Sequence, residues 1–314
     1  MTDANDRLQP PERLVRTLSA RQGPAGDAAR DWLATLPARA RHYLERWELT
    51  PLRVQRPGGR SSMVVLVRQS DDTPAALKLG LLDEETAQEH AALTQWNGWG
   101  AARLLRADPE GGALLLERLH GDVSLRSLPD PKAMLEAAAT LQRLWVNPEE
   151  GHRFVSVADR TAALADRVRE QRAQPWAADA EAVVDEALEL RDALVADAPG
   201  DAPGDALLHG DYHQGNVLAG DRVPWLAIDP KPLVGERAYD LARLVRDRSD
   251  TLLASSGAAS AARRRVAKLA DSLDVDRDRL RGWSHFRTTE AALRRLSAGQ
   301  RQQGELLLEF AGLL

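Results

Sequence analysis

The residues best suited to chemistry lie in one stretch, LLHGDYHQGNVLAGDRVPWLAIDPK, which runs from Leu207 to Lys231. It contains His209 and Asp211, then Asn216 five residues after that aspartate, and Asp229 at the end of an apolar run. In phosphoryl transfer an aspartate accepts the proton of the acceptor hydroxyl, while an asparagine and a second aspartate bind magnesium. Magnesium needs few protein oxygens besides phosphates and water. We therefore expect Asp211 to be the catalytic base and Asn216 and Asp229 to be metal ligands.

The residues between Asn216 and Asp229 indicate how these two side chains would meet. Val217–Leu218 and Trp225–Ile228 can pair as a hairpin around the turn at Gly220–Asp221, which would set the asparagine beside the aspartate. Taken alone, each aspartate of the stretch is more often a turn residue or a helix cap. The joint spacing, order and hairpin context favour the chemical interpretation.

A lysine and a glutamate earlier in the chain fit the same chemistry. Lys78 lies in AALKL, a run typical of a strand, and Glu89 follows eleven residues later, about two turns into a helix predicted from Asp83 to Trp96. Kinases pair such a lysine with a helix glutamate to hold the nucleotide phosphates. A strand lysine is more often solvent-facing, but only four of the 42 basic residues here are lysines. A lysine kept in such a composition indicates a need for its compact charge. Glu85 is the alternative partner.

Two further segments are candidates for contacts with a nucleotide. In PGGRSS, the residues Gly59, Ser61 and Ser62 stand between the first two predicted strands, where a loop over the phosphates belongs. A double glycine also marks an ordinary hairpin turn. The extended backbone at Glu117 and Leu119 can offer an adenine ring a donor and an acceptor, although an ordinary strand is equally compatible.

The elements that must carry these residues change in character near Leu119. Before it the pattern predicts a small antiparallel sheet with one inserted helix. A helical segment, Asp31–Trp47, precedes the sheet and is interrupted by Pro37, and residues 1–30 are polar and expected to be frayed at their start. The predicted strands are Leu52–Gln55, Met63–Arg68, Ala75–Leu79, Arg103–Ala107 and Ala113–Leu119.

The second half of the chain is predicted to be mainly helical. Its expected helices are Met134–Trp145, Val157–Gln171, Ala178–Val195 and a helical region from Ala238 to the end. We therefore predict the α+β class, with residues 1–119 as an N-terminal lobe that grips the nucleotide phosphates. Residues 120–314 would form a helical C-terminal lobe that carries the metal and acceptor site.

Composition narrows the classes of function. The chain has 314 residues, 43% of them apolar, and a net charge of −5 without a concentrated basic stripe, so we expect no nucleic-acid partner. It has no cysteine, which excludes disulfides and thiol nucleophiles. We find no signal peptide and no apolar run long enough for a membrane span, and expect a cytoplasmic protein. The oligomeric state is left open.

LLHGDYHQGNVL and WLAIDPKPLVGERAYDLARLVRDR resemble the aminoglycoside phosphotransferase superfamily, and most of all its streptomycin 6-kinase and hydroxyurea phosphotransferase branch. The similarity extends from about Trp32 to the end of the chain. The resemblance implies a protein-kinase-like bilobal fold, ATP with Mg²⁺ as donor, and O-phosphorylation of an antibiotic. The usual loop of the superfamily reads HGDLHPGN, so Tyr212 and Gln214 replace Leu and Pro, and Tyr212 could line the acceptor pocket.

Streptomycin carries two guanidinium groups on the ring that is phosphorylated, so the resemblance also implies carboxylates near Asp211. The candidate substrate-binding residues are the carboxylates Glu236, Asp240 and Glu290, with Trp283 and His285 as walls. Asp240 can equally tie its helix to the loop that contains Asp211, and we favour that role. His209 is expected to be scaffold, and the role of His213 is open.

The resulting hypothesis is an ATP-dependent kinase that phosphorylates a small cationic antibiotic, with the 6-hydroxyl of streptomycin first, and so confers resistance. The alternative enzyme is a kinase of another small hydroxyl compound such as hydroxyurea, a sugar, a choline-like amine or homoserine. A non-catalytic nucleotide-binding scaffold is the alternative from another class. A scaffold has no use for a base at Asp211, and turnover would separate the two.

Overall fold

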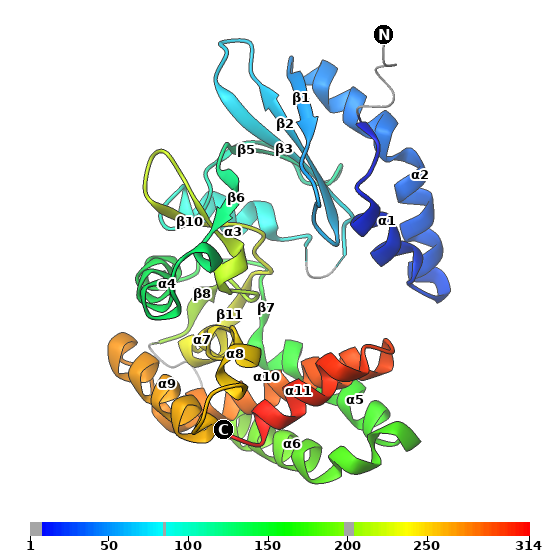
Figure 1. Ribbon diagram of the computed structural model, residues 1–314. Coiled ribbons are helices and arrows are strands. Elements are labelled where there is room, and N and C mark those ends of the chain that lie inside the picture. The colour runs from blue at the N-terminus through cyan, green and yellow to red at the C-terminus, as the bar shows by residue number, and fades with distance from the viewer. Residues whose placement is uncertain (1–7, 84–85, 198–203) are drawn as a thin grey trace. The chain divides into compact units, whose positions relative to one another are not determined.

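The computed structural model describes residues 8–83, 86–197 and 204–314 (Figure 1). The chain divides into two compact units. Unit 1 consists of Met1–Ser124 and Leu218–Ile228, and unit 2 consists of Leu125–Val217 and Asp229–Leu314. The boundary thus falls five residues after the expected one, and a short segment from the second half of the chain belongs to unit 1.

Unit 1 is built on a five-stranded antiparallel sheet with the order β1-β2-β3-β5-β4. Its strands are β1 (Thr50–Val54), β2 (Ser62–Arg68), β3 (Pro74–Gly80), β4 (Leu104–Asp108) and β5 (Ala113–Glu117). These are the five strands expected from the sequence, and their ends shift by only one or two residues. β5 ends at Glu117, so Leu119 lies just beyond the sheet.

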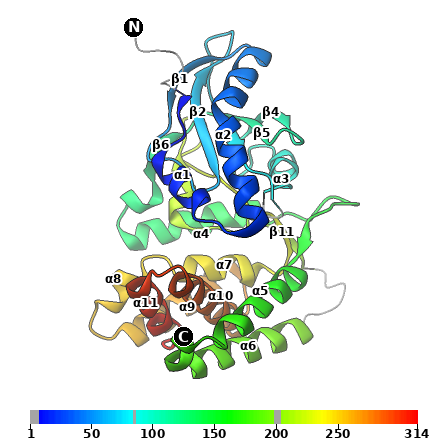
Figure 2. The same ribbon diagram turned by 90° about the vertical axis from the view of Figure 1, so that its right-hand side faces the viewer.

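Two helices, α1 (Glu12–Ser19) and α2 (Gly23–Arg46), cover one face of this sheet (Figures 1 and 2). Their apolar side chains, among them the fully buried Leu14, Leu18 and Leu36, share one core with alternate residues of β2, β3 and β5. The sequence did not predict α1 or the start of α2, because residues 1–30 are polar in composition. An apolar stripe buried on the sheet stabilises both helices.

The expected interruption of the second helix is also wrong, because α2 continues through Pro37. A proline removes one backbone hydrogen bond and strains the preceding turn. Leu36, Ala40 and Leu44 nevertheless keep one face of α2 buried on the sheet. Tertiary packing therefore holds the helix together where local preference would break it.

A second sheet in unit 1 has the order β10-β9-β6. It joins β6 (His120–Ser124), β9 (Val217–Ala219) and β10 (Trp225–Ala227). The predicted hairpin between the segments after Asn216 and before Asp229 is thus confirmed, with β9 one residue longer and β10 one residue shorter than expected. The pattern did not reveal β6, whose residues are mostly exposed and show no apolar alternation.

Unit 2 contains a short three-stranded sheet, β7-β11-β8, and most of the helices. Its strands are β7 (Val155–Ser156), β8 (Ala206–Leu208) and β11 (Leu233–Gly235). Its α-helices are α4 (Asp130–Leu144), α5 (Val157–Arg172), α6 (Glu181–Ala196), α7 (Arg237–Val245), α8 (Ser249–Leu253), α9 (Ala258–Leu273), α10 (Arg277–Ser297) and α11 (Arg301–Ala311). Helix α10 packs against α5, α6, α7, α9 and α11 and forms the centre of this unit.

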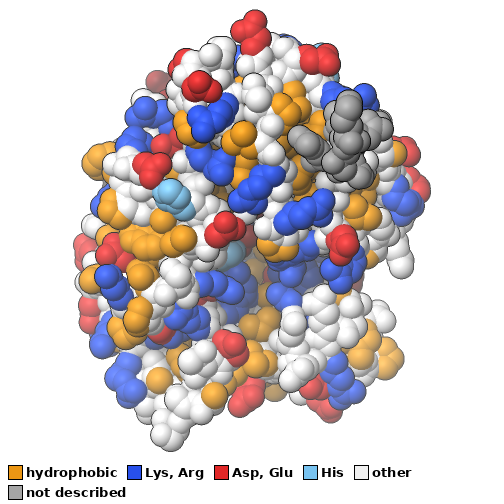
Figure 3. Space-filling model, turned by 45° about the horizontal axis from the view of Figure 1, so that its top comes forward, with side chains coloured by type: hydrophobic (Ala, Val, Ile, Leu, Met, Phe, Trp, Pro, Cys, Tyr) orange, Lys and Arg blue, Asp and Glu red, His pale blue; other side chains and the backbone are white. Residues whose placement is uncertain are grey.

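The surface carries mixed charge. Acidic and basic side chains are intermixed over the face shown in Figure 3. Within the described ranges, none of the helices is long and apolar enough to cross a membrane.

Candidate active site

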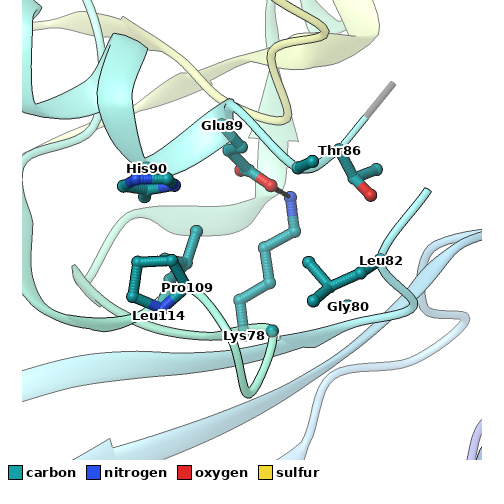
Figure 4. Close-up of a pocket in the computed structure, with 10 residues that line it drawn as sticks. Lys78, Gly80, Leu82, Thr86, Glu89, His90, Pro109 and Leu114 are labelled. Carbon is teal, nitrogen blue, oxygen red and sulfur yellow. Dashed lines mark hydrogen bonds and ion pairs between the residues drawn. The ribbon is translucent and has the colours of Figure 1, made fainter. Parts of the chain in front are cut away.

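Lys78 and Glu89 form a buried ion pair in unit 1 (Figure 4). The Lys78 Nζ lies 2.6 Å from each carboxylate oxygen of Glu89, and the two residues are 6% and 4% exposed. Side chains alternate along β3, so Ala75, Leu77 and Leu79 face α1 and α2 while Lys78 points to the other face of the sheet. That face carries the glutamate.

Glu89 is the first residue of α3 (Glu89–Trp96), not a residue two turns inside a longer helix. The expected start at Asp83 is therefore wrong, although Asp83 Oδ1 does accept the backbone N–H of Thr86 in a turn before the helix. A carboxylate in the first helical turn is favoured by the exposed N–H groups there. The alternative partner, Glu85, lies outside the described residues.

A small pocket adjoins the ion pair. Gly80, Leu82, Thr86, His90, Pro109 and Leu114 surround the lysine stem and the carboxylate in Figure 4. All of them belong to unit 1. The lysine ammonium is thus fixed at the edge of a partly apolar hollow, where a charge interacts strongly with an incoming anion.

The segment before β2 is shaped by its glycines. Gly58 has φ +79°, and a Cβ there would lie 2.6 Å from Pro11 Cγ, so only glycine fits. The backbone carbonyl of Ser61 accepts the N–H of Leu81, while Ser62 begins β2 and is only 5% exposed. Of the two serine hydroxyls proposed for phosphate contacts, that of Ser61 is the more accessible, and Gly59 packs beside Ser62.

The end of β5 has two backbone groups already engaged. Glu117 donates its N–H to Arg103 O at 2.9 Å, and Leu119 O accepts the N–H of Gly121 at 3.1 Å. The Glu117 carboxylate binds Arg222 and the backbone N–H of Arg103 at 2.7 Å each. The acceptor and donor that this segment can offer an adenine edge are therefore the Glu117 carbonyl and the Leu119 N–H.

In unit 2 the segment His209–Asn216, here called the HGD loop, leaves the C-terminal end of β8. β11 pairs antiparallel with β8, so the segment Asp229–Lys231 enters the sheet at the end where the HGD loop leaves it. Lys231 N donates to His209 O at 2.8 Å. Gly210 has φ +77°, and a Cβ on it would fall 1.9 Å from Lys231 O, so the two segments meet in a contact that requires glycine.

Asp240 of α7 anchors the start of the HGD loop. Its two carboxylate oxygens accept the backbone N–H groups of His209 at 2.8 Å and Gly210 at 2.9 Å, and it is fully buried. Trp145 Nε1 also donates to Asp240 Oδ2, at 3.4 Å. The expectation of Asp240 as an acceptor contact is therefore wrong, and the alternative role in tying the helix to the loop is the one found.

Asp247, two residues beyond α7, anchors the other end of the loop. Its Oδ2 accepts the backbone N–H of Gln214 at 2.5 Å. The Gln214 side chain is buried and accepts Arg248 Nε at 2.8 Å. Tyr212 is fully buried as well and donates its hydroxyl to Ala137 O at 2.7 Å, so it does not line an acceptor pocket.

The Asp211 carboxylate is the accessible acid of this loop, with 30% of its side chain exposed. Its Oδ1 accepts Arg243 Nε at 3.3 Å. Burial raises the pKa of Asp211, but the positive charges of the nearby Arg243, Lys231 and Arg287 lower it by more than burial raises it. The pKa therefore lies well below the usual range. Asp211 is therefore ionised at neutral pH.

His213 is not a cation at neutral pH. Burial, together with Arg243, lowers the pKa of His213 to about 4. Its Nδ1 accepts the N–H of Gly215 at 3.0 Å, which places the ring proton on Nε2. His213 also acts to lower the pKa of Asp211, but only when it is itself protonated. His209 is fully buried in the scaffold.

Asn216 and Asp229 both flank the β9–β10 hairpin and both belong to unit 2. Asn216 Nδ2 donates to Asp211 O at 3.1 Å, which fixes the amide so that its oxygen is the atom left for a cation. Asp229 has φ 58°, a left-handed conformation that non-glycine residues adopt mainly where function or packing requires it. An amide and a carboxylate oxygen fit magnesium, which prefers oxygen ligands.

The remaining acceptor candidates are either buried or already paired. Glu236 binds Arg279 Nε and Trp283 Nε1 at 2.6 Å each, so its charge is already paired. Trp283 and His285 are 1% and 2% exposed and are core residues of α10, not walls of an open site. Glu290 pairs with Arg294 at 3.1 Å. The expectation of Trp283 and His285 as walls is therefore wrong, while Glu236 and Glu290 as acceptor contacts stay predictions.

Comparison with known proteins agrees with this geometry. A sequence model of the family "Aminoglycoside/hydroxyurea antibiotic resistance kinase" matches residues 46–299. The chain belongs to this family. The resemblance expected from the HGD loop and the segment after it is confirmed, and the kinase is a phosphotransferase that acts on a hydroxyl group.

Two known relatives of this kinase carry different names. Streptomycin 6-kinase of Streptomyces glaucescens is 37% identical over 294 residues, covering 90% of this chain and 89% of that protein. Hydroxyurea phosphotransferase of Kitasatospora aureofaciens is 39% identical over 282 residues, covering 88% and 77%. The two similarities do not separate the acceptors.

Solved structures show that the kinase-like fold is shared. Aminoglycoside phosphotransferase APH(4)-Ia, in complex with ADP and hygromycin B, superimposes with a TM-score of 0.62 at 16% identity, covering 87% of this chain and 96% of that one. Choline kinase LicA from Streptococcus pneumoniae gives 0.59 at 14% identity, covering 87% and 98%. The predicted protein-kinase-like fold class is confirmed.

The sequence analysis did not identify three charged residues of the candidate site. Arg243 contacts Asp211, Asp247 holds Gln214, and Arg287 donates to Gly210 O at 2.6 Å. The first two follow Asp240 in the sequence at positions i+3 and i+7, the spacing of one helix face, which is the signal that could have revealed them. Arg287 lies 77 residues from Gly210 and leaves no such local signal.

Proposed function

We propose that this kinase transfers the γ-phosphoryl group of ATP to a hydroxyl of an aminoglycoside-type antibiotic, with the 6-hydroxyl of streptomycin as the first candidate. The observation that carries the proposal is Asp211: an ionised, accessible carboxylate on a loop that is otherwise tied down at both ends. The streptomycin 6-kinase relatives, 37% identical over about nine-tenths of the chain, support the acceptor.

Each candidate residue has a role in this proposal. Asp211 orients the acceptor hydroxyl and accepts its proton as the phosphoryl group is transferred. Asn216 and Asp229 would hold Mg²⁺, which neutralises the charge of the phosphates when it is bound with ATP. A carboxylate with a lowered pKa is a weak base, and such a base suffices where the transition state is loose and the hydroxyl loses its proton late.

Unit 1 would supply the grip on the nucleotide. Lys78, fixed by Glu89, would bind the α- and β-phosphates, and the backbone near Gly59 with the Ser61 hydroxyl would approach the phosphates. The Glu117 carbonyl and the Leu119 N–H would meet the adenine edge. Ser62, which is buried, would act through the loop backbone.

Hydroxyurea is the second candidate acceptor, because the hydroxyurea phosphotransferase relative is 39% identical. The carboxylates expected to bind the streptomycin guanidinium groups are either buried or paired within unit 2, which weakens one argument that favoured the larger, cationic acceptor. Streptomycin stays first because its kinases cover more of the chain.

The test is ADP release measured with streptomycin, other aminoglycosides, hydroxyurea and simple amino alcohols. We expect turnover with one antibiotic, and we expect Asp211→Asn to lose at least about 10³-fold in turnover while nucleotide binding, measured by calorimetry, changes little. Asp250→Asn, on the exposed surface of α8, is the matched control and should behave as wild type. Full activity of Asp211→Asn would refute the role of that residue. ATP binding without turnover on any acceptor would leave the scaffold alternative.

A further inference from the structure

One face of the α7 region carries three charged side chains at successive helical turns. Asp240 and Asp247 lie seven residues apart, and Arg243 stands between them. The two aspartates bind backbone N–H groups at opposite ends of the HGD loop, at His209–Gly210 and at Gln214. The arginine is directed at the side chain in the middle of the loop, the Asp211 carboxylate.

Backbone anchors alone do not fix that carboxylate. They determine where the Cα and Cβ of Asp211 stand, but the last side-chain torsion of an aspartate is broad and roughly two-fold. A hydroxyl that must be aligned with a phosphorus atom needs one carboxylate oxygen at a defined position. A contact with the carboxylate itself is therefore required, and Arg243 Nε supplies it at 3.3 Å from Oδ1.

Arg243 is in turn held from its other side. One of its terminal nitrogens lies 3.8 Å from Asp247 Oδ1, and Asp247 is almost completely buried, with 1% of its side chain exposed. Asp247 Oδ1 also accepts a hydrogen bond from Arg126 Nη2 at 3.3 Å. The Arg243 guanidinium thus lies between the buried carboxylate of Asp247 and the carboxylate of Asp211. The Arg243 side chain is 18% exposed.

The neighbouring cations have other contacts. Arg287 donates to Gly210 O at 2.6 Å and to Tyr239 O at 2.8 Å, and it stacks over the Tyr239 ring. It supports the backbone before Asp211, not the carboxylate. Lys231 contributes positive charge near Asp211 through a flexible stem with a compact head. Arg243 combines charge with a planar donor directed at one oxygen.

We propose that Arg243 is a positioning residue of the transfer reaction: it holds Asp211 Oδ1, backed by Asp247, and so presents Oδ2 to the acceptor hydroxyl. This inference rests on the proposed function, since it needs Asp211 to be the group that meets the hydroxyl. Arg243 itself touches neither reactant.

The experiment compares wild type, Arg243→Ala, Arg243→Lys and Asp247→Asn in turnover, acceptor KM and nucleotide Kd. We expect Arg243→Ala to lower kcat about 100-fold, the size of effect that a misplacement near 1 Å produces, with nucleotide Kd within about two-fold. Arg243→Lys and Asp247→Asn should lie between. Added guanidinium ion at millimolar concentration should restore part of the kcat of Arg243→Ala. Arg264→Ala, an exposed arginine of α9, is the matched control.

A double-mutant cycle with Asp211→Asn separates positioning from general structural damage. If Arg243 acts through Asp211, then Arg243→Ala should lower turnover little further in the Asp211→Asn background, and the two substitutions should couple in the free energy of unfolding. Equal losses in both backgrounds, or an unchanged kcat in Arg243→Ala, would overturn the inference. Absence of turnover in wild type on every acceptor would refute the proposed function instead, while the unfolding cycle would still report whether the contact exists.

Discussion

The two candidate regions of this kinase are held in opposite ways. In unit 1 the candidate phosphate lysine is fixed by another side chain, as Lys78 and Glu89 pair at 2.6 Å with both charges buried. In unit 2 the HGD loop is fixed through its backbone, whose N–H groups bind the carboxylates of Asp240 and Asp247. One region depends on a pair of charges and the other on a helix that spans the loop.

This difference has an energetic consequence. A buried ion pair loses most when one partner is removed, and it can be replaced as a unit by apolar residues at little loss of stability. Backbone N–H groups cannot be substituted, so the carboxylates that satisfy them have no equivalent exchange. Replacing Lys78 and Glu89 together by apolar residues should therefore cost little stability. Replacing the carboxylates that hold the HGD loop should destabilise the protein.

The largest effect is expected from Asp240→Ala. It leaves two buried N–H groups without their acceptor, each at about 1–3 kcal/mol, so unit 2 should lose about 4 kcal/mol of stability. Urea unfolding followed by the change in tryptophan fluorescence measures this, with Asp250→Ala as the control. A loss below about 1 kcal/mol would mean that water or other groups replace the carboxylate and that the loop is not fixed through its backbone.

The next effect tests the lysine region directly. Lys78→Met leaves Glu89 as a buried, uncompensated carboxylate and should destabilise the protein by about 3–5 kcal/mol. The double variant Lys78→Met, Glu89→Leu should recover most of that stability while turnover stays low, because the ammonium is still missing. Urea unfolding and ADP release measure the two properties. A double variant less stable than the single one would contradict the comparison.

The same contrast explains how much of the site the sequence reveals. Lys78 and Glu89 lie eleven residues apart, and Asp211 and Asn216 five apart, so local spacing was enough to mark each pair as candidate site residues. Three strands of unit 1 were predictable because they are short apolar runs bounded by turn residues, as expected for β2, β3 and β5, which are buried almost throughout. The Asp240 carboxylate was foreseen as an alternative anchor, since it lies on the predicted helix that follows the loop.

What the sequence did not reveal depends on tertiary contacts. Arg287 reaches Gly210 from α10, and the burial of Trp283 and His285 follows from the packing of α10 at the centre of unit 2. No local pattern distinguishes a tryptophan that walls a pocket from one in a core. Helix α2 continues through Pro37 for the same reason: burial against the sheet, which local propensity does not encode.

A smaller effect is expected from Tyr212→Phe. The buried hydroxyl donates to Ala137 O at 2.7 Å, so its removal should lower stability by about 1 kcal/mol. Because the ring does not face solvent, the acceptor KM should stay unchanged. Steady-state kinetics with the preferred acceptor measure this point. A several-fold rise in KM without loss of stability would return Tyr212 to the acceptor site and weaken the view that the loop interior is purely structural.

The smallest effect concerns a histidine that belongs to neither candidate region. Burial lowers the pKa of His285, and Arg281 acts in the same direction, while Glu186 at 3.6 Å opposes them. The unfolded chain binds a proton below about pH 6.5 that the folded state does not, so stability should fall as pH drops from there toward the lowered pKa.

His285→Gln should flatten this dependence between pH 7.5 and 5.5, as measured by urea unfolding at each pH. His42→Gln, an exposed histidine of α2, should keep the wild-type slope. Because His285 is buried away from solvent in α10, its substitution should leave the pH dependence of turnover unchanged, and a shift in that profile would instead connect His285 to the Asp211 region.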